Sequence, residues 1–463
     1  MMWNLEKNKA NVAMIDENER SIRYADIQMF IEKISNVCGQ RDVVLCLCKN
    51  TFGSIIGYLA FVELHIVPIL LEASIEKSLM KKVSINYEPY YIWAPEEMDF
   101  QEYCECISFL GYRLWKKREA KVHIIHPNLA VLLSTSGTTG SSKMVRLSYD
   151  NLFENAYSIV DYLEISQLER PITVLPMCYA YGLSIINSHI LSGATLLVTT
   201  KSIIQKKFWK MAINYKATSF SGVPYTYQML ERMHFCEWDL PCLRTLTQAG
   251  GKIPEKLQCL FAEYAATQGK KFIIMYGQCE ATARISYLPS EYAKLKMGSI
   301  GKAIPKGKLY VVNETGKKIE ESGSIGELLY SGPNVMMGYA ESVLDLKLGD
   351  VQGDFLLTGD IGYFDESGFY YIVGRKKRLI KLFGKRISLD ELENYLKDNC
   401  GVSCVCIEKN EKLLIYLTDI SQKVVVEEEL IKILKIPAMA LCVQEISEIP
   451  RNSSGKIQYS KLE

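Results

Sequence analysis

Residues 132–143 of the chain read LLSTSGTTGSSK. The apolar run that ends at Leu133 predicts a strand, and a segment rich in hydroxyl groups and glycine then leads to one lysine, Lys143. Glycines let backbone N–H groups turn toward an anion, hydroxyl groups add donors, and lysine adds positive charge. We therefore expect a phosphate-binding loop, with a flexible linker as the alternative. The segment is not a P-loop, because Gly137 and Gly140 lie three positions apart and no glycine directly precedes the lysine.

The composition is that of an ordinary globular protein, with 48% hydrophobic and 23% charged residues. A length of 463 residues exceeds what one hydrophobic core usually organises, so we expect two or more domains. The formal net charge of +1 gives no general attraction to nucleic acid or acidic membranes. The N-terminal segment includes no apolar signal-peptide core, and Glu63, His65 and Pro68 interrupt the longest apolar stretch. We expect a cytoplasmic protein without a membrane span.

The fourteen cysteines include three pairs with the spacing C-x-C, namely Cys46/Cys48, Cys104/Cys106 and Cys404/Cys406. In a strand this spacing places both thiols on one face, where cysteine behaves as a small apolar residue. We expect reduced, mostly buried thiols in preference to disulfides or a zinc site. The five histidines are scattered, so a structural metal is not expected.

Predicted strands and helices alternate through the first three-quarters of the chain, which is typical of an α/β fold with parallel strands. Apolar residues at helical spacing predict helices at residues 22–37, 54–64, 149–163, 185–191, 208–215 and 225–233. Short apolar runs predict strands at residues 42–48, 66–71, 90–93, 129–133, 172–175, 194–198 and 245–249, and one near Ser219. We expect the helix at 149–163 to begin with a cap at or near Asp150.

The pattern changes after Tyr276, because residues 300–371 are dense in glycine and short β-like runs. Seven basic residues and no acid follow between Arg375 and Arg386, a run that is most often a solvated face or a general anion patch. A nucleic-acid site is the alternative, but no aromatic residues are interleaved with the charges. Ser388 then has the spacing of a helix cap, which predicts a small C-terminal α+β unit.

Short motifs follow the loop in a defined order. They are LPMCYAYG at 175–182, MYGQCE at 275–280, GSIG at 298–301, GEL at 326–328, SGP at 331–333, GY at 338–339, TGD at 358–360, GR at 374–375 and IPRNSSGK at 449–456. In this order they resemble the adenylate-forming (AMP-binding) enzymes, the superfamily of acyl- and aryl-CoA synthetases, peptide-synthetase adenylation domains and luciferase. The resemblance implies a large α/β N-terminal domain at residues 1–376, with a β-rich subdomain at about 300–373, and a small mobile α+β C-terminal domain at 377–463.

The resemblance implies that a carboxylic acid attacks the α-phosphate of ATP and forms an acyl-adenylate as pyrophosphate leaves. Three catalytic residues are expected: Lys456 at the reacting carboxylate, Glu280 as the Mg²⁺ ligand, and Lys143 at the leaving phosphates. Tyr276 would lie against the adenine, and Asp360 with Arg375 would bond the ribose hydroxyls. The expected ATP- and AMP-binding set also includes Thr135, Ser136, Gly137, Thr138, Thr139, Gly140, Gly277 and Cys279. Taken singly, Tyr276 could be a core aromatic, Asp360 a turn residue and Glu280 a helix cap.

The second half-reaction implied by the resemblance passes the acyl group to a pantetheine thiol of coenzyme A or of a carrier protein, which we expect to be a separate chain. Lys377 would be the hinge about which the C-terminal domain turns. This turn would withdraw Lys456 and bring Gly384 to a tunnel for the thiol. The acyl pocket would be formed by Tyr179, Val223, Tyr225, Ala249, Gly250, Gly251 and Gln278.

Several positions depart from the family pattern. They are Ser142 in place of proline, Tyr149 and Tyr179 in place of histidine, Cys279 in place of threonine, and Tyr459 in place of arginine. A thiol is a weaker donor than a hydroxyl, so Cys279 could hold a phosphate less firmly. The five expected functional charges are all present, which favours a working enzyme.

Residues 181–184 contain no aspartate to pair with a substrate ammonium group, which favours a simple carboxylic acid over an α-amino acid. The small and aromatic pocket residues suit an aryl or a short to medium acyl group. Two alternatives remain: a discrete amino-acid adenylation enzyme that loads a carrier protein, and a non-catalytic nucleotide-binding member of a biosynthetic assembly. No nucleic-acid partner is expected.

Overall fold

The computed structural model describes residues 3, 5–39, 41–119, 123–134, 143–382, 385–409, 412–434, 436–451 and 457–462. Contacts between Cα atoms divide these residues into two compact units. The first unit holds the described residues up to 134, together with 143–308 and 331–356. The second holds residues 309–330 and the described residues from 357 onward. The units are described one at a time.

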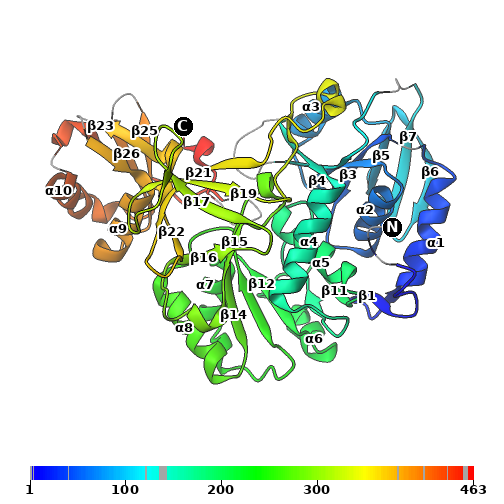
Figure 1. The fold of residues 1–463 in the computed structure, drawn as a ribbon, viewed down its shortest axis with the longest axis horizontal. Coiled ribbons are helices and arrows are strands. Elements are labelled where there is room, and N and C mark those ends of the chain that lie inside the picture. Colours follow the sequence, from blue (N-terminus) through cyan, green and yellow to red (C-terminus); the bar gives the residue numbers. More distant parts are fainter. Residues whose placement is uncertain are drawn as a thin grey trace. The chain divides into compact units, whose positions relative to one another are not determined.

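One sheet of the first unit is built around consecutive parallel strands. Its strand order is β2 (Ser21–Arg23), β1 (Val12–Asp16), β11 (Leu196–Val198), β10 (Pro171–Ile172), β12 (Ser219–Gly222), β13 (Thr245–Gln248), β14 (Lys271–Tyr276), β15 (Ser286–Leu288) and β16 (Ser299–Ala303). The chain segments between the strands of this sheet include helices α4 (Tyr149–Leu163), α5 (Ala180–Leu191), α6 (Lys206–Asn214), α7 (Pro224–Arg232) and α8 (Glu255–Thr267). Figure 1 shows β1 in blue and the later elements of this sheet, with their helices, in cyan and green.

The second sheet of this unit has parallel strands at its centre, where β4, β3 and β5 are neighbours. Its order is β20 (Gly338–Ala340), β9 (Met144–Ser148), β8 (Leu129–Ser134), β4 (Val67–Glu72), β3 (Val43–Cys48), β5 (Tyr91–Pro95), β7 (Tyr112–Lys117) and β6 (Tyr103–Phe109). The accompanying helices are α1 (Tyr24–Ser35), α2 (Phe52–Glu63) and α3 (Lys77–Tyr87).

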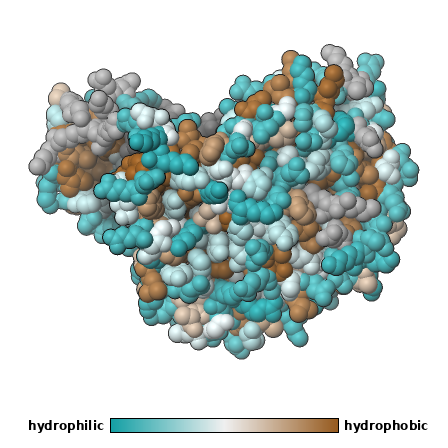
Figure 2. Space-filling model, in the orientation of Figure 1, coloured by the Kyte–Doolittle hydropathy of each residue, from teal (hydrophilic) through white to brown (hydrophobic). Residues whose placement is uncertain are grey.

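A single hydrophobic cluster joins the two sheets of the first unit. It runs from Met14 of β1 through helices α1, α2 and α5 to Val44 of β3. Helix α2 is buried over nearly its whole length, which explains its almost uninterrupted apolar sequence. No helix formed by the described residues is long and apolar enough to cross a membrane. Figure 2 shows that hydrophilic side chains predominate on the visible face of this unit.

The second unit contains three smaller sheets. The first has the order β18 (Lys318–Ile319), β17 (Lys308–Val312), β19 (Gly326–Ser331), β21 (Phe355–Phe364) and β22 (Tyr370–Arg375), and the hairpin β23 (Leu379–Leu382) and β24 (Lys385–Ser388) follows. The last comprises β25 (Cys404–Lys409), β26 (Lys412–Leu417) and β27 (Leu441–Glu445), with helices α9 (Leu389–Cys400) and α10 (Lys423–Leu434). The predicted helix cap is confirmed, because the Ser388 side chain accepts a hydrogen bond from the Glu391 N–H at 3.3 Å.

Most predicted elements are confirmed, and two details were wrong. The cap expected at or near Asp150 is the Ser148 side chain, and Asp150 lies in the first turn of α4. Helix α5 begins at Ala180 and not at residue 185, since Gly182 lets the first turn pack against the backbone of Pro176. Cys104 and Cys106 are exposed because β6 is an edge strand, whereas the other two C-x-C pairs are buried as expected.

Arg146 of β9 is fully buried, and its partners are backbone carbonyl groups. Its guanidinium donates to the oxygens of Met337 at 2.9 Å, Tyr339 at 3.1 Å and Gly349 at 3.1 Å. Burial lowers the pKa of Arg146. These bonds tie residues 337–349 to β9, where β20 pairs with the strand that directly follows Lys143.

Replacement of Arg146 by methionine should therefore destabilise the first unit. We expect Arg146→Met to lower the free energy of unfolding by about 2–4 kcal/mol, because several buried carbonyl groups lose a charged donor. Urea unfolding followed by tryptophan fluorescence measures this change. The control Arg232→Met removes an exposed side chain at the end of α7 and should cost less than about 1 kcal/mol. Equal stability of the two variants would contradict the assigned role of Arg146.

Candidate active site

The predicted phosphate-binding loop connects two adjacent strands. Thr135 to Ser142 lie outside the described residues, but both ends of the loop are described. Ser134 ends β8 and pairs with Met144 at the start of β9, directly after Lys143. The antiparallel pairing holds the two ends of the loop together at the edge where β8 ends.

Three side chains meet beside this loop. The Tyr339 hydroxyl donates a hydrogen bond to Glu280 Oε1 at 2.8 Å, and Lys143 Nζ lies 4.0 Å from the centre of the Tyr339 ring. Lys143 Nζ also lies 3.9 Å from a carboxylate oxygen of Glu341. Burial and the neighbouring Glu280 carboxylate raise the pKa of Tyr339, so its hydroxyl keeps its proton and donates. The arrangement brings a carboxylate to the hydroxyl and a cation over the face of one aromatic ring.

The segment that carries Glu280 is held against the start of the loop. Strand β14 ends at Tyr276, and Glu280 lies in the short helix η2 (Cys279–Ala281). A Cβ atom on Gly277 would lie 1.9 Å from the carbonyl oxygen of Ala283, so this turn requires glycine. The buried Cys279 thiol donates to the Ser134 carbonyl oxygen across 3.8 Å. Glu280 is thus positioned by the turn at Gly277 and by the Tyr339 hydroxyl.

Only some of the predicted acyl-pocket residues lie next to one another. Val223 lies next to Gly250, since a Cβ atom there would be 3.1 Å from Val223 Cγ1, and Ala249 is buried nearby at the end of β13. Tyr225, on α7, leaves 49% of its surface exposed. The Tyr179 hydroxyl lies 3.5 Å from Glu72 Oε2.

Two more of these residues lie at turns. Gly251 follows Gly250, and a Cβ atom on it would lie 3.2 Å from Pro224 Cγ. Gln278 is partly buried at the cap of η2, where its carbonyl oxygen accepts hydrogen bonds from the N–H groups of Ala281 and Ala283.

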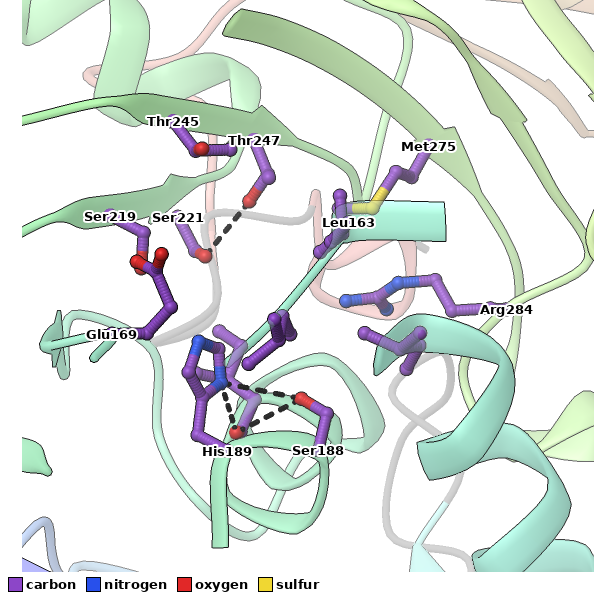
Figure 3. A pocket seen from close by; sticks show the side chains of 13 residues that line it. Leu163, Glu169, Ser188, His189, Ser219, Ser221, Thr245, Thr247, Met275 and Arg284 are labelled. Carbon is purple, nitrogen blue, oxygen red and sulfur yellow. Dashed lines mark hydrogen bonds between the residues drawn. The ribbon is translucent and has the colours of Figure 1, made fainter. Parts of the chain in front are cut away.

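A pocket lined by polar side chains opens between the sheet and helices α4 and α5 (Figure 3). The space inside it that is open to water is about 20 Å³, room for about one water molecule. Its walls are formed by Ile159, Leu163, Ile165, Glu169, Ile185, Ser188, His189, Ser219, Ser221, Thr245, Thr247, Met275 and Arg284. The sequence analysis did not identify this pocket.

Hydroxyl groups from several elements form a network in the wall of the pocket. Ser221 Oγ and Thr247 Oγ1 are 2.8 Å apart, and the Tyr181 hydroxyl lies 3.0 Å from Thr247 Oγ1 (Figure 3 shows the first pair). The Tyr227 hydroxyl donates to the Thr247 carbonyl oxygen at 2.8 Å. The network therefore fixes the hydroxyl groups of β12 and β13 in place.

His189 is a buried neutral imidazole in the same pocket. Its Nδ1 lies 2.8 Å from the Ile185 carbonyl oxygen, which can only accept, so Nδ1 carries the proton and Nε2 is an acceptor. Burial lowers the pKa of His189 to about 4. The imidazole is therefore uncharged at neutral pH.

In the second unit, Asp360 and Arg375 face each other across β21 and β22. A carboxylate oxygen of Asp360 lies 3.2 Å from Arg375 Nε, with the aspartate buried and the arginine largely exposed. Asp360 lies within a strand and not in a turn. Lys377 is in the short helix η5 (Lys376–Arg378).

The basic run is not a uniformly solvated face. Arg378 is mostly buried and forms ion pairs with Asp390 and Glu393, and Lys376 Nζ lies 2.7 Å from Glu327 Oε2. The Arg378 guanidinium also lies 4.1 Å from the centre of the Tyr459 ring. Gly384 and Lys456 lie outside the described residues.

A family model described as AMP-binding enzyme matches residues 2–340. The chain belongs to the AMP-binding enzyme family. The expected resemblance is thereby confirmed for this range, which includes Lys143, Glu280 and Tyr339.

Curated relatives of this AMP-binding enzyme include several CoA ligases. The probable 4-coumarate–CoA ligase 1 of Dictyostelium discoideum is 31% identical over 60% of this chain and 50% of its own length. The 2-succinylbenzoate–CoA ligase of Bacillus cereus is 26% identical over 93% of this chain and 92% of its own length. For the first three relatives the match spans only about half of the relative, namely 50%, 52% and 53% of its length.

Solved structures confirm the fold. The o-succinylbenzoate CoA synthetase of Bacillus subtilis, in complex with the acyl-adenylate intermediate OSB-AMP, superposes with a TM-score of 0.79. The match covers 99% of this chain and 97% of that one at 22% identity. The α/β fold expected from the motif order is therefore confirmed.

Two site residues were missed by the sequence analysis. Tyr339 belongs to a short GY motif that marked the family but suggested no role, and its contact with Glu280 joins residues 59 positions apart. Arg284 follows Glu280 by four positions, and its basic charge beside the motif was the available signal. Local sequence patterns predict neither the contact of Tyr339 with Glu280 nor the place of Arg284 in the pocket wall.

Loss of the Tyr339 hydroxyl should weaken the hold on Glu280. We expect Tyr339→Phe to raise the dissociation constant of Mg²⁺-ATP by about 3- to 10-fold, because one hydrogen bond to the carboxylate is lost while the ring beneath Lys143 stays. Calorimetric titration measures the constant. The control is Tyr87→Phe, whose hydroxyl donates to Ala340 in the same strand, β20, and which should bind as the wild type does. Unchanged binding by Tyr339→Phe would contradict a role for this hydroxyl.

Acid should destabilise the first unit through His189. Because its pKa in the folded chain is about 4 and that of an unfolded histidine about 6.5, the unfolded chain binds more protons between these values. The contribution of neutral His189 to the free energy of unfolding is therefore fully present above pH 6.5. It is lost as the pH falls toward 4, by about 3 kcal/mol in all. Unfolding midpoints measured across this range should fall less steeply for His189→Gln than for the wild type. Parallel pH profiles would contradict this assignment.

Proposed function

We propose that the chain joins a carboxylic acid to a pantetheine thiol in two steps. The acid first attacks the α-phosphate of ATP, so that an acyl-adenylate forms and pyrophosphate leaves. The thiol of coenzyme A, or of a separate carrier protein, then attacks the acyl carbon and AMP leaves. Family membership and the CoA ligases among the relatives support this acid–thiol ligase reaction.

The observation that carries the proposal is the Lys143, Tyr339 and Glu280 group beside the loop ends. A cation and a carboxylate at the edge of a glycine-rich loop suit a polyphosphate that arrives with Mg²⁺. We assign Lys143 to the leaving phosphates, where its charge offsets the charge that develops on pyrophosphate.

The residues present fit a magnesium ion held mainly by the substrate. Glu280 offers one carboxylate, and no group of three or more possible metal ligands occurs within the described part of the chain. Mg²⁺ commonly takes one or two protein carboxylates and completes its shell with phosphate oxygens and water. When bound, the ion would neutralise charge on the phosphates, and the Tyr339 hydroxyl would orient its Glu280 ligand.

The remaining nucleotide contacts follow the family assignments. Asp360 offers a buried carboxylate acceptor for the ribose hydroxyls, with Arg375 beside it, and Tyr276 is proposed to lie against the adenine. Gly277 and Cys279 are assigned to AMP, and Thr135, Ser136, Gly137, Thr138, Thr139 and Gly140 to the phosphates. Lys456 as the adenylation lysine, Lys377 as the hinge between domains 1–376 and 377–463, and Gly384 at the thiol tunnel are likewise proposals from sequence.

The substrate is proposed to be a simple carboxylic acid. Residues 181–184 form part of α5 and bring no carboxylate that could pair with an amino group. The polar pocket leaves only about 20 Å³ of open space, which disfavours a long acyl chain there. A cytoplasmic location is also part of the proposal.

Acid-dependent exchange of labelled pyrophosphate into ATP tests the reaction. We expect exchange with at least one acid from a panel of short aliphatic, aromatic and amino acids, and none without acid. Exchange only with amino acids would favour the amino-acid adenylation alternative. Binding of ATP without exchange for any acid would overturn the proposal in favour of a non-catalytic nucleotide-binding protein.

Replacement of Lys456 separates the two half-reactions. We expect Lys456→Ala to lower the adenylation rate by at least about 100-fold, because a charge at the reacting phosphate is lost, while thioester formation from a preformed acyl-adenylate persists. Single-turnover kinetics measure each step. The control Lys461→Ala removes a nearby lysine and should affect neither step. Equal losses in both steps would contradict the assigned role.

A further inference from the structure

Arg284 is a buried cation at the edge of the polar pocket. It precedes β15, and only 2% of its surface is exposed. In Figure 3 its guanidinium points from the right-hand wall into the pocket. Such a group is expensive to bury without a counter-charge, because it gives up its hydration.

The partners that the described residues provide for Arg284 are all uncharged. Its guanidinium lies 4.3 Å from the centre of the Tyr181 ring, one terminal nitrogen lies 3.4 Å from the Ala283 carbonyl oxygen, and it also interacts with the Tyr162 hydroxyl. Nε is buried without a hydrogen-bond partner in the described structure. No ion pair of Arg284 with a described carboxylate is present, so donors remain for an anion.

The one carboxylate that lines the pocket is already engaged. Glu169 Oε1 lies 2.5 Å from a terminal nitrogen of Arg244, and its other oxygen accepts a hydrogen bond from Thr218 Oγ1. His189 is uncharged, so it brings no negative charge either. The pocket therefore holds an unneutralised positive charge at Arg284.

The pocket continues the predicted acyl site along one face of the sheet. Side chains alternate along extended chain, and the backbone at Val223 is still extended, so Ser221 points to the same face as Val223. Ala249 directly follows β13, two positions after Thr247. Tyr181, whose ring centre lies 4.3 Å from the Arg284 guanidinium, packs against the two hydrophobic clusters that contain Val223 and Ala249. An acid whose reacting carboxylate lies at the strand ends would thus extend its other end toward Ser221, Thr247 and Arg284.

We infer that Arg284 binds a second carboxylate of the substrate, so that the acid activated here is a short dicarboxylic acid. The inference rests on the proposed ligase function and specifies its substrate class. Two donors of a guanidinium match the two oxygens of a carboxylate, and the fixed hydroxyls of Ser221 and Thr247 offer further hydrogen bonds. An entirely apolar acyl group would leave the guanidinium buried without a counter-charge.

Matched pairs of acids test the inference. Butanoate is compared with butanedioate, hexanoate with hexanedioate, and benzoate with the benzenedicarboxylates, by pyrophosphate exchange. We expect the wild type to have a higher kcat/KM for the diacid in at least one pair. Arg284→Met should lower that diacid-to-monoacid ratio by about 10- to 100-fold, as expected for the loss of a charged hydrogen-bonded contact.

Three further variants keep the test decisive. Arg284→Lys retains the charge and should keep part of the preference, whereas Arg284→Gln removes the charge and replaces Arg284→Met if that variant does not fold. Arg232→Met removes an exposed arginine at the end of α7 that does not line the pocket, and it should leave the ratio unchanged. A wild type that prefers the monoacid in every pair, or a ratio that Arg284 variants do not change, would overturn the inference.

Direct binding separates this inference from the ligase proposal. Calorimetric titration of the same acid pairs, with a non-hydrolysable ATP analogue present, needs no turnover. Diacid preference that depends on Arg284 in this assay supports the pocket assignment even if no acid elicits exchange, which would overturn only the ligase reaction. Exchange without any diacid preference would leave the ligase proposal intact and overturn the role of Arg284.

Discussion

The buried guanidinium of Arg146 is the interaction on which the arrangement of the candidate site depends. An arginine without access to water must find acceptors, and this one finds them on the backbone of residues 337–349. Those bonds hold β20 beside β9 and thereby place Tyr339 in contact with both Lys143 and Glu280. A side chain that touches no expected ligand thus determines the position of the ring that contacts this cation and this carboxylate.

Parallel strands supply the second constraint. Because β12, β13 and β14 run in the same direction, the turns after them begin at the same edge of the sheet. The Tyr276–Glu280 segment and the predicted acyl residues Val223 and Ala249 follow these strand ends. Inward from that edge, the alternation of side chains along β12 and β13 produces a wall of hydroxyl groups.

The two buried arginines of the first unit differ in how they are satisfied. Arg146 donates to several carbonyl oxygens and so connects segments that lie far apart in the sequence. Arg284 has an aromatic ring and weak polar contacts, and it faces a pocket. Burial alone does not separate structural from ligand-binding arginines; the number and strength of their acceptors does.

Much of the fold and the family could be predicted from the sequence, because helices, strands and motifs are encoded locally. The strand before residue 134, the helix at 149–163 and the cap at Ser388 all follow from the spacing of neighbouring residues. Errors arose where tertiary packing decided the outcome: the early start of α5 depends on contact between Gly182 and Pro176, and the exposure of Cys104 on the edge position of β6. Burial of Arg378 within a basic run similarly depends on carboxylates of α9.

By itself the sequence determined the family, the alternation of strands and helices, and which charged residues are available for phosphate chemistry. Only the tertiary structure decided that Tyr339 bonds Glu280, that Arg146 anchors Tyr339 from 193 positions away, and that Arg284 faces a pocket. The physical reason is that short-range patterns fix backbone conformation, whereas the partners of a buried polar group depend on which distant segments the fold brings together.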